Sequence, residues 1–175
     1  KKNLKNNSIK NASIDNAINC ITKSLKIMNN SLLDLKSLNN FSPEICDIQA
    51  VLLEGINLST VYIGDKDIKI NLEGKDTAPV FLDENKFLAC MVNSIKNAIE
   101  AINDKGEINI SLQINEIVSI KISNNGEPVK NPESIFCAGF TTKSTGSGLG
   151  LHICAQNLLA QNAEIKLTRA TADIT

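Results

Sequence analysis

The sequence predicts an α+β domain of helices and short strands, preceded by a separate helical segment. Residues 83–102 place their apolar side chains on one face of a helix. Residues 107–123 contain two stretches that alternate apolar and polar side chains, and their close spacing favours an antiparallel hairpin. Residues 14–35 follow a 3.5-residue apolar period, which is typical of helical bundles. We therefore divide the chain into a helical segment, 1–40, and a mixed domain, 41–175.

The composition is that of a soluble globular protein with no charge signature of nucleic-acid binding. The 175 residues are 42% hydrophobic and 21% charged, and the formal net charge is −1. This balance argues against electrostatic capture of nucleic acid or of an anionic membrane. The sequence shows no signal peptide and no apolar run long enough to span a membrane. Five scattered cysteines without a C-x-x-C pair favour buried thiols in a reducing cytoplasm over disulfides or zinc.

The first segment carries a narrow apolar seam. Ser13 is a suitable N-cap for its helix. A seam with this period normally packs against another helix, so we expect self-association. The alternative is a single amphipathic helix lying on its own domain, although such helices usually show a wider apolar stripe. The seam, at alternating spacings of four and three, consists of Ile14, Ile18, Ile21, Leu25, Met28, Leu32 and Leu35.

The chain between this helix and residue 83 predicts one further helix and two short strands. Ser42 followed by Pro43 is typical of a helix start, and we expect this helix to run through Leu52. The apolar spacing after Pro43 supports it. The other predicted elements are a turn at 64–66 and strands at 68–72 and 80–82.

The helix predicted over 83–102 has an unusual polar face. Asp83 can cap its first turn. Asn93, Asn97 and Glu100, spaced four and three, gather opposite the apolar face. Asparagine is a poor helix former. Its amide oxygen is a hard, neutral ligand that suits Mg²⁺ when nucleotide phosphates supply most other contacts. This face is therefore either a ligand site or an ordinary solvated surface.

A long irregular segment, 129–147, leads into a glycine-rich helix start. A compact domain normally keeps such a segment only for function. Gly146, Gly148 and Gly150 open a helix predicted over 149–159. Glycine lets a phosphate chain lie against backbone N–H groups, and the positive end of the helix dipole attracts the anion. The alternative is a flexible surface turn.

Two further features flank these motifs. The second strand of the hairpin ends in the run 124–128, Asn-Asn-Gly-Glu-Pro. Near the end of the chain, residues 164–168 predict another strand, and 173–175 look like the start of its partner. An Asn-bearing helix, a strand-end Asn-x-Gly and a long segment closing on glycines thus follow one another along the chain.

In this order the motifs resemble the catalytic, ATP-binding domain of bacterial sensor histidine kinases, within the superfamily of gyrase, the Hsp90 chaperones and the MutL repair proteins. Residues 93–101, NSIKNAIEA, resemble the family's asparagine box. Residues 122–126, ISNNG, resemble its first glycine box. Residues 140–143, FTTK, and 146–151, GSGLGL, resemble the lid end and the second glycine box. The resemblance covers about 42–175. The N-terminal helix with the apolar seam resembles the second helix of the family's dimerisation bundle.

The resemblance implies an α/β sandwich, with a mixed, mostly antiparallel sheet backed by helices on one face and a long ATP lid. It implies ATP and Mg²⁺ as cofactors, with Asn97 as the metal ligand and Asn93 against the phosphates. Asn124 would meet the adenine edge, and Gly126 would let the base approach. The ATP-binding residues that it implies are Asn93, Lys96, Asn97, Asn124, Gly126, Thr141, Thr142, Lys143, Gly146, Ser147, Gly148, Leu149, Gly150 and Leu151.

The resemblance also implies a reaction and partners. The γ-phosphoryl of ATP passes to a histidine on a dimerisation helix outside these 175 residues, with positioning and charge neutralisation providing most of the catalysis. The partners are a second copy, bound through the N-terminal helix, and a response regulator receiver domain. We expect a cytoplasmic location for this segment, with no nucleic-acid or membrane contact, even if the parent protein is anchored in the inner membrane. His152, the only histidine, is followed by Ile153 rather than an acid, so we expect it to pack rather than to accept phosphate.

Two departures from the family pattern affect the nucleotide. Asn124 stands where the family usually has an adenine-reading aspartate, and Pro128 replaces a glycine. Loss of the charge predicts ATP binding weaker by about fivefold, and a smaller preference for ATP over GTP.

The alternatives to a histidine kinase are a nucleotide-binding pseudokinase acting as a dimeric scaffold and an anti-sigma-factor-type serine kinase. Asn93 opposes the latter and the ATP-hydrolysing branches, because both have a glutamate there and an amide cannot take a proton.

Overall fold

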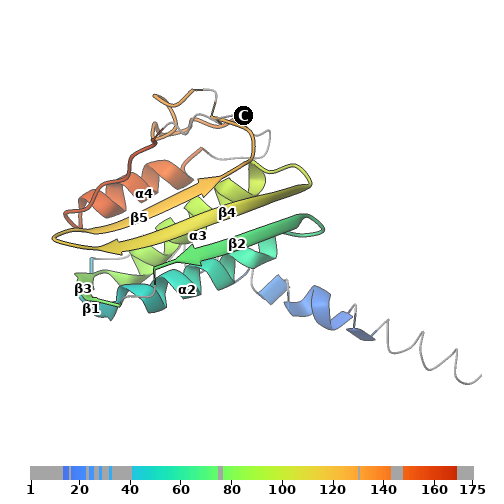
Figure 1. The fold of residues 1–175 in the computed structure, drawn as a ribbon, viewed down its shortest axis with the longest axis horizontal. Helices are drawn as coiled ribbons and strands as arrows, with labels where there is room; N and C mark the ends of the chain where they lie inside the picture. Colours follow the sequence, from blue (N-terminus) through green and yellow to red (C-terminus); the bar gives the residue numbers. More distant parts are fainter. Residues whose placement is uncertain are drawn as a thin grey trace, which may run out of the picture.

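A three-stranded sheet forms one layer of the domain, and helices cover one of its faces (Figure 1). The computed structural model describes residues 14, 15, 17–22, 24, 25, 28, 32, 41–74, 77–129, 131–142 and 148–168. The central strand, β4 (Lys105–Ile114), pairs in parallel with β2 (Asp67–Glu73) and antiparallel with β5 (Val118–Asn124). Along β4 buried and exposed side chains alternate, because successive residues of a strand point to opposite faces. The predicted hairpin and the strand at 68–72 are confirmed.

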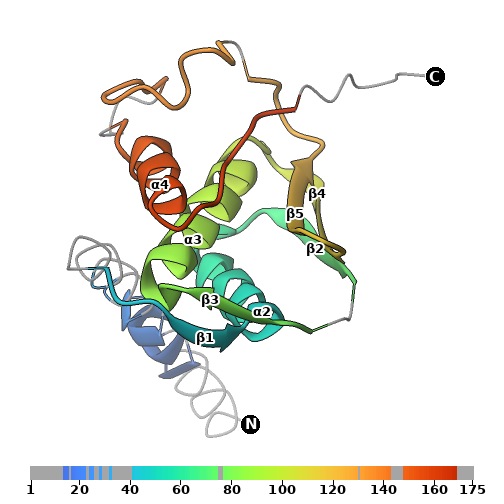
Figure 2. The same cartoon turned by 90° about the vertical axis from the view of Figure 1, so that its left-hand side faces the viewer.

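Helices form the layer beside the inner face of this sheet (Figure 2). The long helix α3 (Glu84–Glu100) is the central one, and it packs against both α2 (Ile48–Ser59) and α4 (Gly150–Leu159). A 3-10 turn, η1 (Thr60–Tyr62), follows α2. The predicted apolar face of α3 is confirmed, because its members are all buried in the core: Phe87, Leu88, Met91, Ile95, Ala98, Ile99 and Ile102. The resulting α/β sandwich is the fold class that the sequence predicts.

A second, two-stranded sheet corrects the predicted start of the first domain helix. Strand β1 (Glu44–Asp47) pairs antiparallel with β3 (Pro79–Leu82), and the helix begins only at Ile48. The side chain of Asp47, rather than that of Ser42, caps the helix by accepting hydrogen bonds from the N–H groups of its first turn. The prediction of a helix starting at Ser42–Pro43 is therefore wrong, because a pairing with a strand far along the chain decides this stretch.

Asp83 joins three elements at the start of α3. It is 4% exposed, and its Oδ1 accepts a hydrogen bond from the Lys86 N–H at 3.0 Å, as an N-cap does. Its Oδ2 accepts from the Ser42 N–H at 2.9 Å, and its own N–H donates to Oε1 of Gln161 at 2.7 Å. The predicted cap is confirmed, and it also fixes the entry to β1 and the end of α4 relative to α3.

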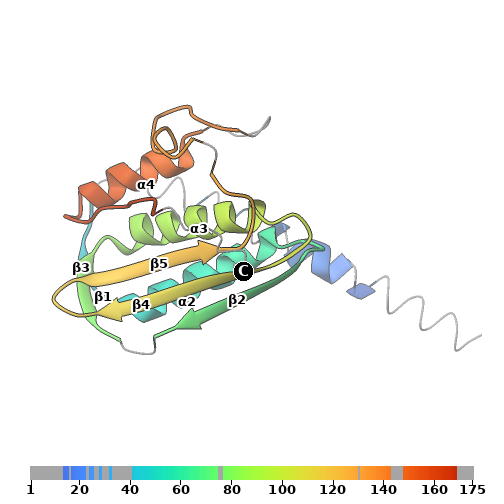
Figure 3. The ribbon, with the colours of Figure 1, turned by 45° about the horizontal axis from the view of Figure 1, so that its top comes forward.

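The predicted strand at 164–168 is wrong. Residues 163–168 run past α4 without strand pairing (Figure 3). Residues 163–167 line a cavity between α3 and the sheet. A strand needs a neighbour, and none of the described strands lies beside this segment. The proposed partner, 173–175, lies outside the described residues. The alternation of Ile165 and Leu167 with polar residues is therefore not sufficient evidence for a strand.

The other predictions outside the core are confirmed in part. The described residues between 14 and 32 are helical, and six of the seven seam side chains are 48–61% exposed. Ser13 and Leu35 lie outside the described residues.

Of the cysteines, Cys90 and Cys154 are buried as expected, whereas Cys20 and Cys137 are exposed. Contact with the Cys154 thiol, together with burial, raises the pKa of Cys90 well above its usual value. Among the described residues, no helix has the length and apolarity to cross a membrane.

A lysine stabilises the end of the central helix. Lys66 Nζ donates to the backbone oxygen of Ile99 at 3.1 Å and to that of Ile102. A cation at this end opposes the negative end of the helix dipole. We expect Lys66→Met to lower the free energy of unfolding by about 1–2 kcal/mol in urea titrations. The matched control is Lys69→Met, an exposed lysine on β2, which we expect to change stability by less than about 0.5 kcal/mol. Equal losses in both variants would contradict this role of Lys66.

Candidate nucleotide-binding site

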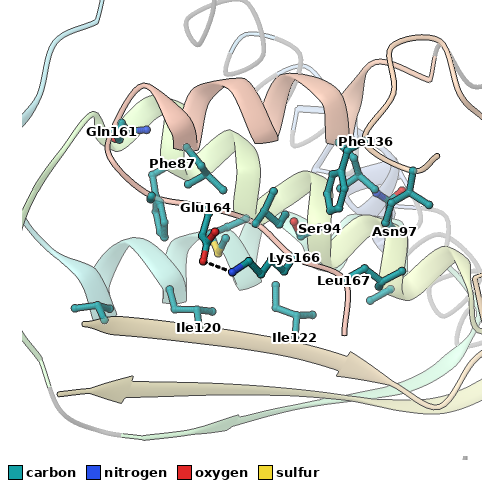
Figure 4. A pocket seen from close by; sticks show the side chains of 18 of the residues that line it. Phe87, Ser94, Asn97, Ile120, Ile122, Phe136, Gln161, Glu164, Lys166 and Leu167 are labelled. Carbon is teal, nitrogen blue, oxygen red and sulfur yellow. Dashed lines mark ion pairs between the residues drawn. The ribbon is translucent and has the colours of Figure 1, made fainter. Parts of the chain in front are cut away.

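A cavity of about 470 Å³ lies between α3, α4 and β5 (Figure 4). Apolar side chains of β5, among them Ile120 and Ile122, line one side of it. The α3 side is formed by Met91, Ser94 and residues of the next two turns. Val129, Ile135 and Phe136, together with Leu151 and Leu158 of α4, close it. The cavity is therefore mostly apolar with a few polar groups, which is the usual character of a small-molecule site.

Two polar residues of α3 lie on the cavity side. Asn97 is half-buried and lines the cavity, so its side chain lies where a bound ligand would meet it. Ser94, one turn earlier, also lines the cavity, and its buried Oγ has no hydrogen-bond partner among the described residues. A buried hydroxyl without a partner is uncommon in proteins and is an available contact for a ligand. The sequence analysis missed Ser94, although its place between Asn93 and Asn97 in the asparagine-rich turn was a usable signal.

Asn93 lies at the contact between α3 and the start of α4. Its Nδ2 donates to the Ala89 carbonyl at 3.0 Å, one turn back in α3. A Cβ at position 150 would lie 3.0 Å from its Oδ1, so the glycine allows α4 to begin close against this amide. The structure therefore brings Asn93 and Gly150 together, as the motifs suggested. Asn93 is not among the residues that line the cavity.

The second glycine box closes the two ends of the lid on each other. Gly148 has φ +67°, and a Cβ there would lie 2.4 Å from the carbonyl carbon of Gly139. The Gly139 N–H donates to the Gly148 carbonyl at 3.1 Å. A side chain at position 148 is thus excluded by backbone conformation and by space. The chain at Gly139 and the residues just before α4 are therefore held side by side.

His152 connects α4 to the lid. Its Nδ1 lies 3.0 Å from the carbonyl oxygen of Phe136, so this nitrogen carries the proton and donates. The side chain of Phe136 lines the cavity, so the contact holds one wall of the site against α4 (Figure 4). This is the packing role expected for His152.

The turn after β5 forms the far end of the cavity. Asn124 lines it, and Asn124 Oδ1 accepts a hydrogen bond from the Gly126 N–H at 2.9 Å. A Cβ at position 126 would lie 2.3 Å from the backbone oxygen of Ala101, so only glycine fits against the end of α3. Close packing against the end of α3 therefore explains why residue 126 is a glycine. The sequence alone did not indicate this reason.

The structure does not bring every predicted site residue to the cavity. Lys96 Nζ lies 4.9 Å from the centre of the Tyr62 ring, on the side of α3 that faces η1, and Lys96 does not line the cavity. Thr141 and Thr142 are exposed and irregular, and Leu149 is 42% exposed, whereas Leu151 lines the cavity. The predicted residues Lys143, Gly146 and Ser147 lie outside the described residues.

The chemistry of the site fits a nucleotide with a magnesium ion better than a bare metal. Among the described residues, no group of three histidine, cysteine or acidic side chains can hold a metal alone. Asn97 instead offers a neutral amide oxygen, which suits Mg²⁺ when phosphates provide charge. The N-cap position of α4, Leu149, makes no side-chain capping hydrogen bond. A helix N-terminus without such a cap is suited to binding phosphate.

Comparison with protein families gives a match to the model described as "Histidine kinase-, DNA gyrase B-, and HSP90-like ATPase". The match covers residues 82–173, just over half of the chain. It spans α3, β5 and α4, and thus most of the residues that line the cavity.

Individual relatives are kinases by name. Sporulation kinase C of Bacillus subtilis (strain 168) is 33% identical over 103 residues, which are 57% of this chain and 24% of that kinase. Sensor histidine kinase FlgS of Helicobacter pylori is 30% identical over 135 residues, 74% of this chain and 34% of FlgS. The chain thus spans about a quarter to a third of these relatives.

Solved structures show the same fold. The nucleotide-free catalytic domain of histidine kinase ThkA superposes with a TM-score of 0.57 at 28% identity, covering 67% of this chain and 82% of that domain. Full-length ShkA, solved in complex with AMPPNP, superposes with a TM-score of 0.61 at 21% identity, covering 80% of this chain and 32% of ShkA.

Proposed function

Because this chain belongs to the histidine kinase-, DNA gyrase B- and HSP90-like ATPase family, we propose that it binds ATP with Mg²⁺ and passes the γ-phosphoryl to a histidine of its parent kinase. The observation that carries the proposal is the cavity itself. It combines an apolar chamber, the amide of Asn97 and the start of a helix without a side-chain cap. These features suit a base, a metal-bound phosphate and a phosphate chain respectively.

The phosphates belong at the end of the cavity where α4 begins. Leu151, in the first turn of α4, lines the cavity there, and the dipole of α4 favours negative charge at its N-terminus. Asn93 lies against Gly150 and is the nearest predicted side chain of α3 to this end. The base then lies toward Asn124, at the other end of the cavity. Lys143 and the other lid residues close on the β- and γ-phosphates.

Asn97 would hold the magnesium ion, together with oxygens of the nucleotide. The ion would neutralise charge on the phosphates during transfer. The residues of this chain bind the nucleotide, orient its γ-phosphoryl and exclude water. Asn93 stands where a hydrolase of this superfamily has a glutamate base, and an amide cannot activate water. Transfer to a histidine is therefore favoured over hydrolysis.

Labelled ATP tests the proposal directly. The chain is incubated with Mg²⁺ and γ-labelled ATP, alone and with the parent's histidine-bearing helix added. We expect no stable label on the chain alone, and acid-labile label on the added helix. Acid-stable label on the chain would instead identify a serine or threonine kinase. Nucleotide binding without any transfer would instead identify a pseudokinase, the alternative that Asn124 favours and Asn97 opposes.

We further propose that the N-terminal helix dimerises through its apolar seam, and that the dimer presents the phosphorylated histidine to a response regulator receiver domain. Six exposed apolar side chains at coiled-coil spacing support the dimer.

We expect Leu25→Lys to convert the dimer to monomers in sedimentation velocity, because it places a charge in the seam. Nucleotide binding should be unchanged, because the described seam residues are no part of the cavity lining. The matched control is Asp15→Lys, which adds a lysine to the same helix outside the seam and should leave the dimer intact. A wild-type chain that is monomeric at tens of micromolar would contradict the proposal and favour a helix lying on its own domain.

A further inference from the structure

The side chain of Asn124 is held in one orientation by the turn that follows it. Its Oδ1 accepts a hydrogen bond from the Gly126 N–H at 2.9 Å. This turn is fixed against the end of α3, because the Glu127 N–H donates to the Ala101 carbonyl at 2.8 Å. Gly126 itself has no room for a side chain beside that same carbonyl. The N–H that holds Asn124 is therefore fixed in place relative to the cavity.

The chemistry of the amide decides which atom remains for a ligand. A backbone N–H can only donate, so it must face the oxygen of the Asn124 amide. The reversed amide would set its NH₂ against the N–H of Gly126, with two donors facing each other. The oxygen of the amide is therefore used within the turn, and the NH₂ is the group that remains for a ligand. Within the described part of the chain it makes no hydrogen bond, although Asn124 lines the cavity.

An aspartate at this position would present the opposite chemistry. A carboxylate held through one oxygen still offers a second oxygen, which accepts hydrogen bonds. An amide held in the same way offers a donor. The difference matters for purines, because the group at C6 is a donating amine in adenine and an accepting oxygen in guanine. Hypoxanthine, the base of ITP, also carries an oxygen there.

We propose that Asn124 presents its NH₂ to the C6 edge of the base, so that this site binds the 6-oxopurine nucleotides ITP and GTP at least as tightly as ATP. The inference rests on the proposed function, in which Asn124 meets the base edge. Around it, Ala101, Ile120 and Ile122 line the cavity with apolar side chains that do not distinguish the bases. The carboxylate of Glu127, which also lines the cavity, accepts a hydrogen bond from Asn103 Nδ2 at 3.4 Å. The Ser94 hydroxyl both donates and accepts, so it is also indifferent to the group at C6.

Calorimetric titration of the whole chain with Mg²⁺ and each nucleotide tests the inference. ATP and ITP are the matched pair, because they differ only at C6 and in the proton on the neighbouring ring nitrogen. We expect a Kd for ITP no higher than that for ATP. Asn124→Asp keeps an acceptor for the Gly126 N–H, and it should shift the ratio of the two Kd values toward ATP by about tenfold or more.

Asn124→Ser is the second variant. Its hydroxyl can accept from the Gly126 N–H as serine does in related turns, but it has no NH₂. We expect it to bind ITP more weakly than the wild type and to show little preference between the nucleotides. A wild type whose Kd for ITP is higher than its Kd for ATP overturns the inference and leaves the proposed function standing. A wild type that binds none of the nucleotides overturns the proposed function and the inference with it.

Discussion

Ile95→Asp is expected to unfold the domain. Ile95 lies in the middle of α3, is 0% exposed and is not among the residues that line the cavity. An aspartate there has no cation or solvent to stabilise its charge. The penalty for an unpaired buried charge is several kcal/mol, which is comparable with the 5–15 kcal/mol that stabilise a typical domain. Circular dichroism and urea titration measure the loss.

The matched control is Ile95→Val, which removes one methylene from the same place. We expect it to cost about 0.5–1.5 kcal/mol and to leave the domain folded, because the small cavity left behind is the only change. If Ile95→Asp unfolds at the same urea concentration as the wild type, Ile95 is not in the core.

Asn97→Ala is expected to remove most Mg²⁺-dependent nucleotide binding without unfolding the domain. The side chain is half-buried beside the cavity, and α3 keeps its apolar face. Alanine also has a higher helix propensity than asparagine. A lost contact to a charged group is worth about 1.5–3 kcal/mol, so the Kd for Mg-ATP should rise about 10- to 100-fold. Titrations with and without Mg²⁺ separate the metal-dependent part of the binding.

Lys96→Ala is the control in the next position of the same helix. Lys96 Nζ contacts the Tyr62 ring rather than the cavity, so we expect Mg-ATP binding close to that of the wild type. A large loss in Lys96→Ala would show that this lysine reaches the nucleotide. Unchanged Mg-ATP binding in Asn97→Ala would show that Asn97 is not the metal ligand.

Local sequence was sufficient wherever the cause of the structure is local. The helix over 83–102 carries its own cap and a continuous apolar face, and both are confirmed. The hairpin follows from two alternating stretches two residues apart. The site motifs could be found because glycines and asparagines are needed at fixed spacings, and the structure places Asn93 against Gly150 and Asn97 and Leu151 at one cavity.

Elements whose partners lie far away in the chain could not be predicted in the same way. Ser42–Pro43 has the local form of a helix start, but residues 44–47 pair with β3, thirty-odd residues later. Residues 164–168 alternate like a strand, but no described strand lies beside them. Both errors have one cause, since strand formation needs a neighbour and the sequence does not say where that neighbour is.

The sequence by itself determined the family, the order of the motifs and the apolar face of α3, because residue types at fixed spacings carry this information. Only the tertiary structure decided which of the predicted site residues lie at the cavity and which contact other parts of the fold. It turned Lys96 toward Tyr62, placed the Ser94 hydroxyl at the cavity and set the oxygen of Asn124 against the Gly126 N–H. The physical reason is that a side chain's direction and its hydrogen-bond partner depend on packing between elements, which no local pattern contains.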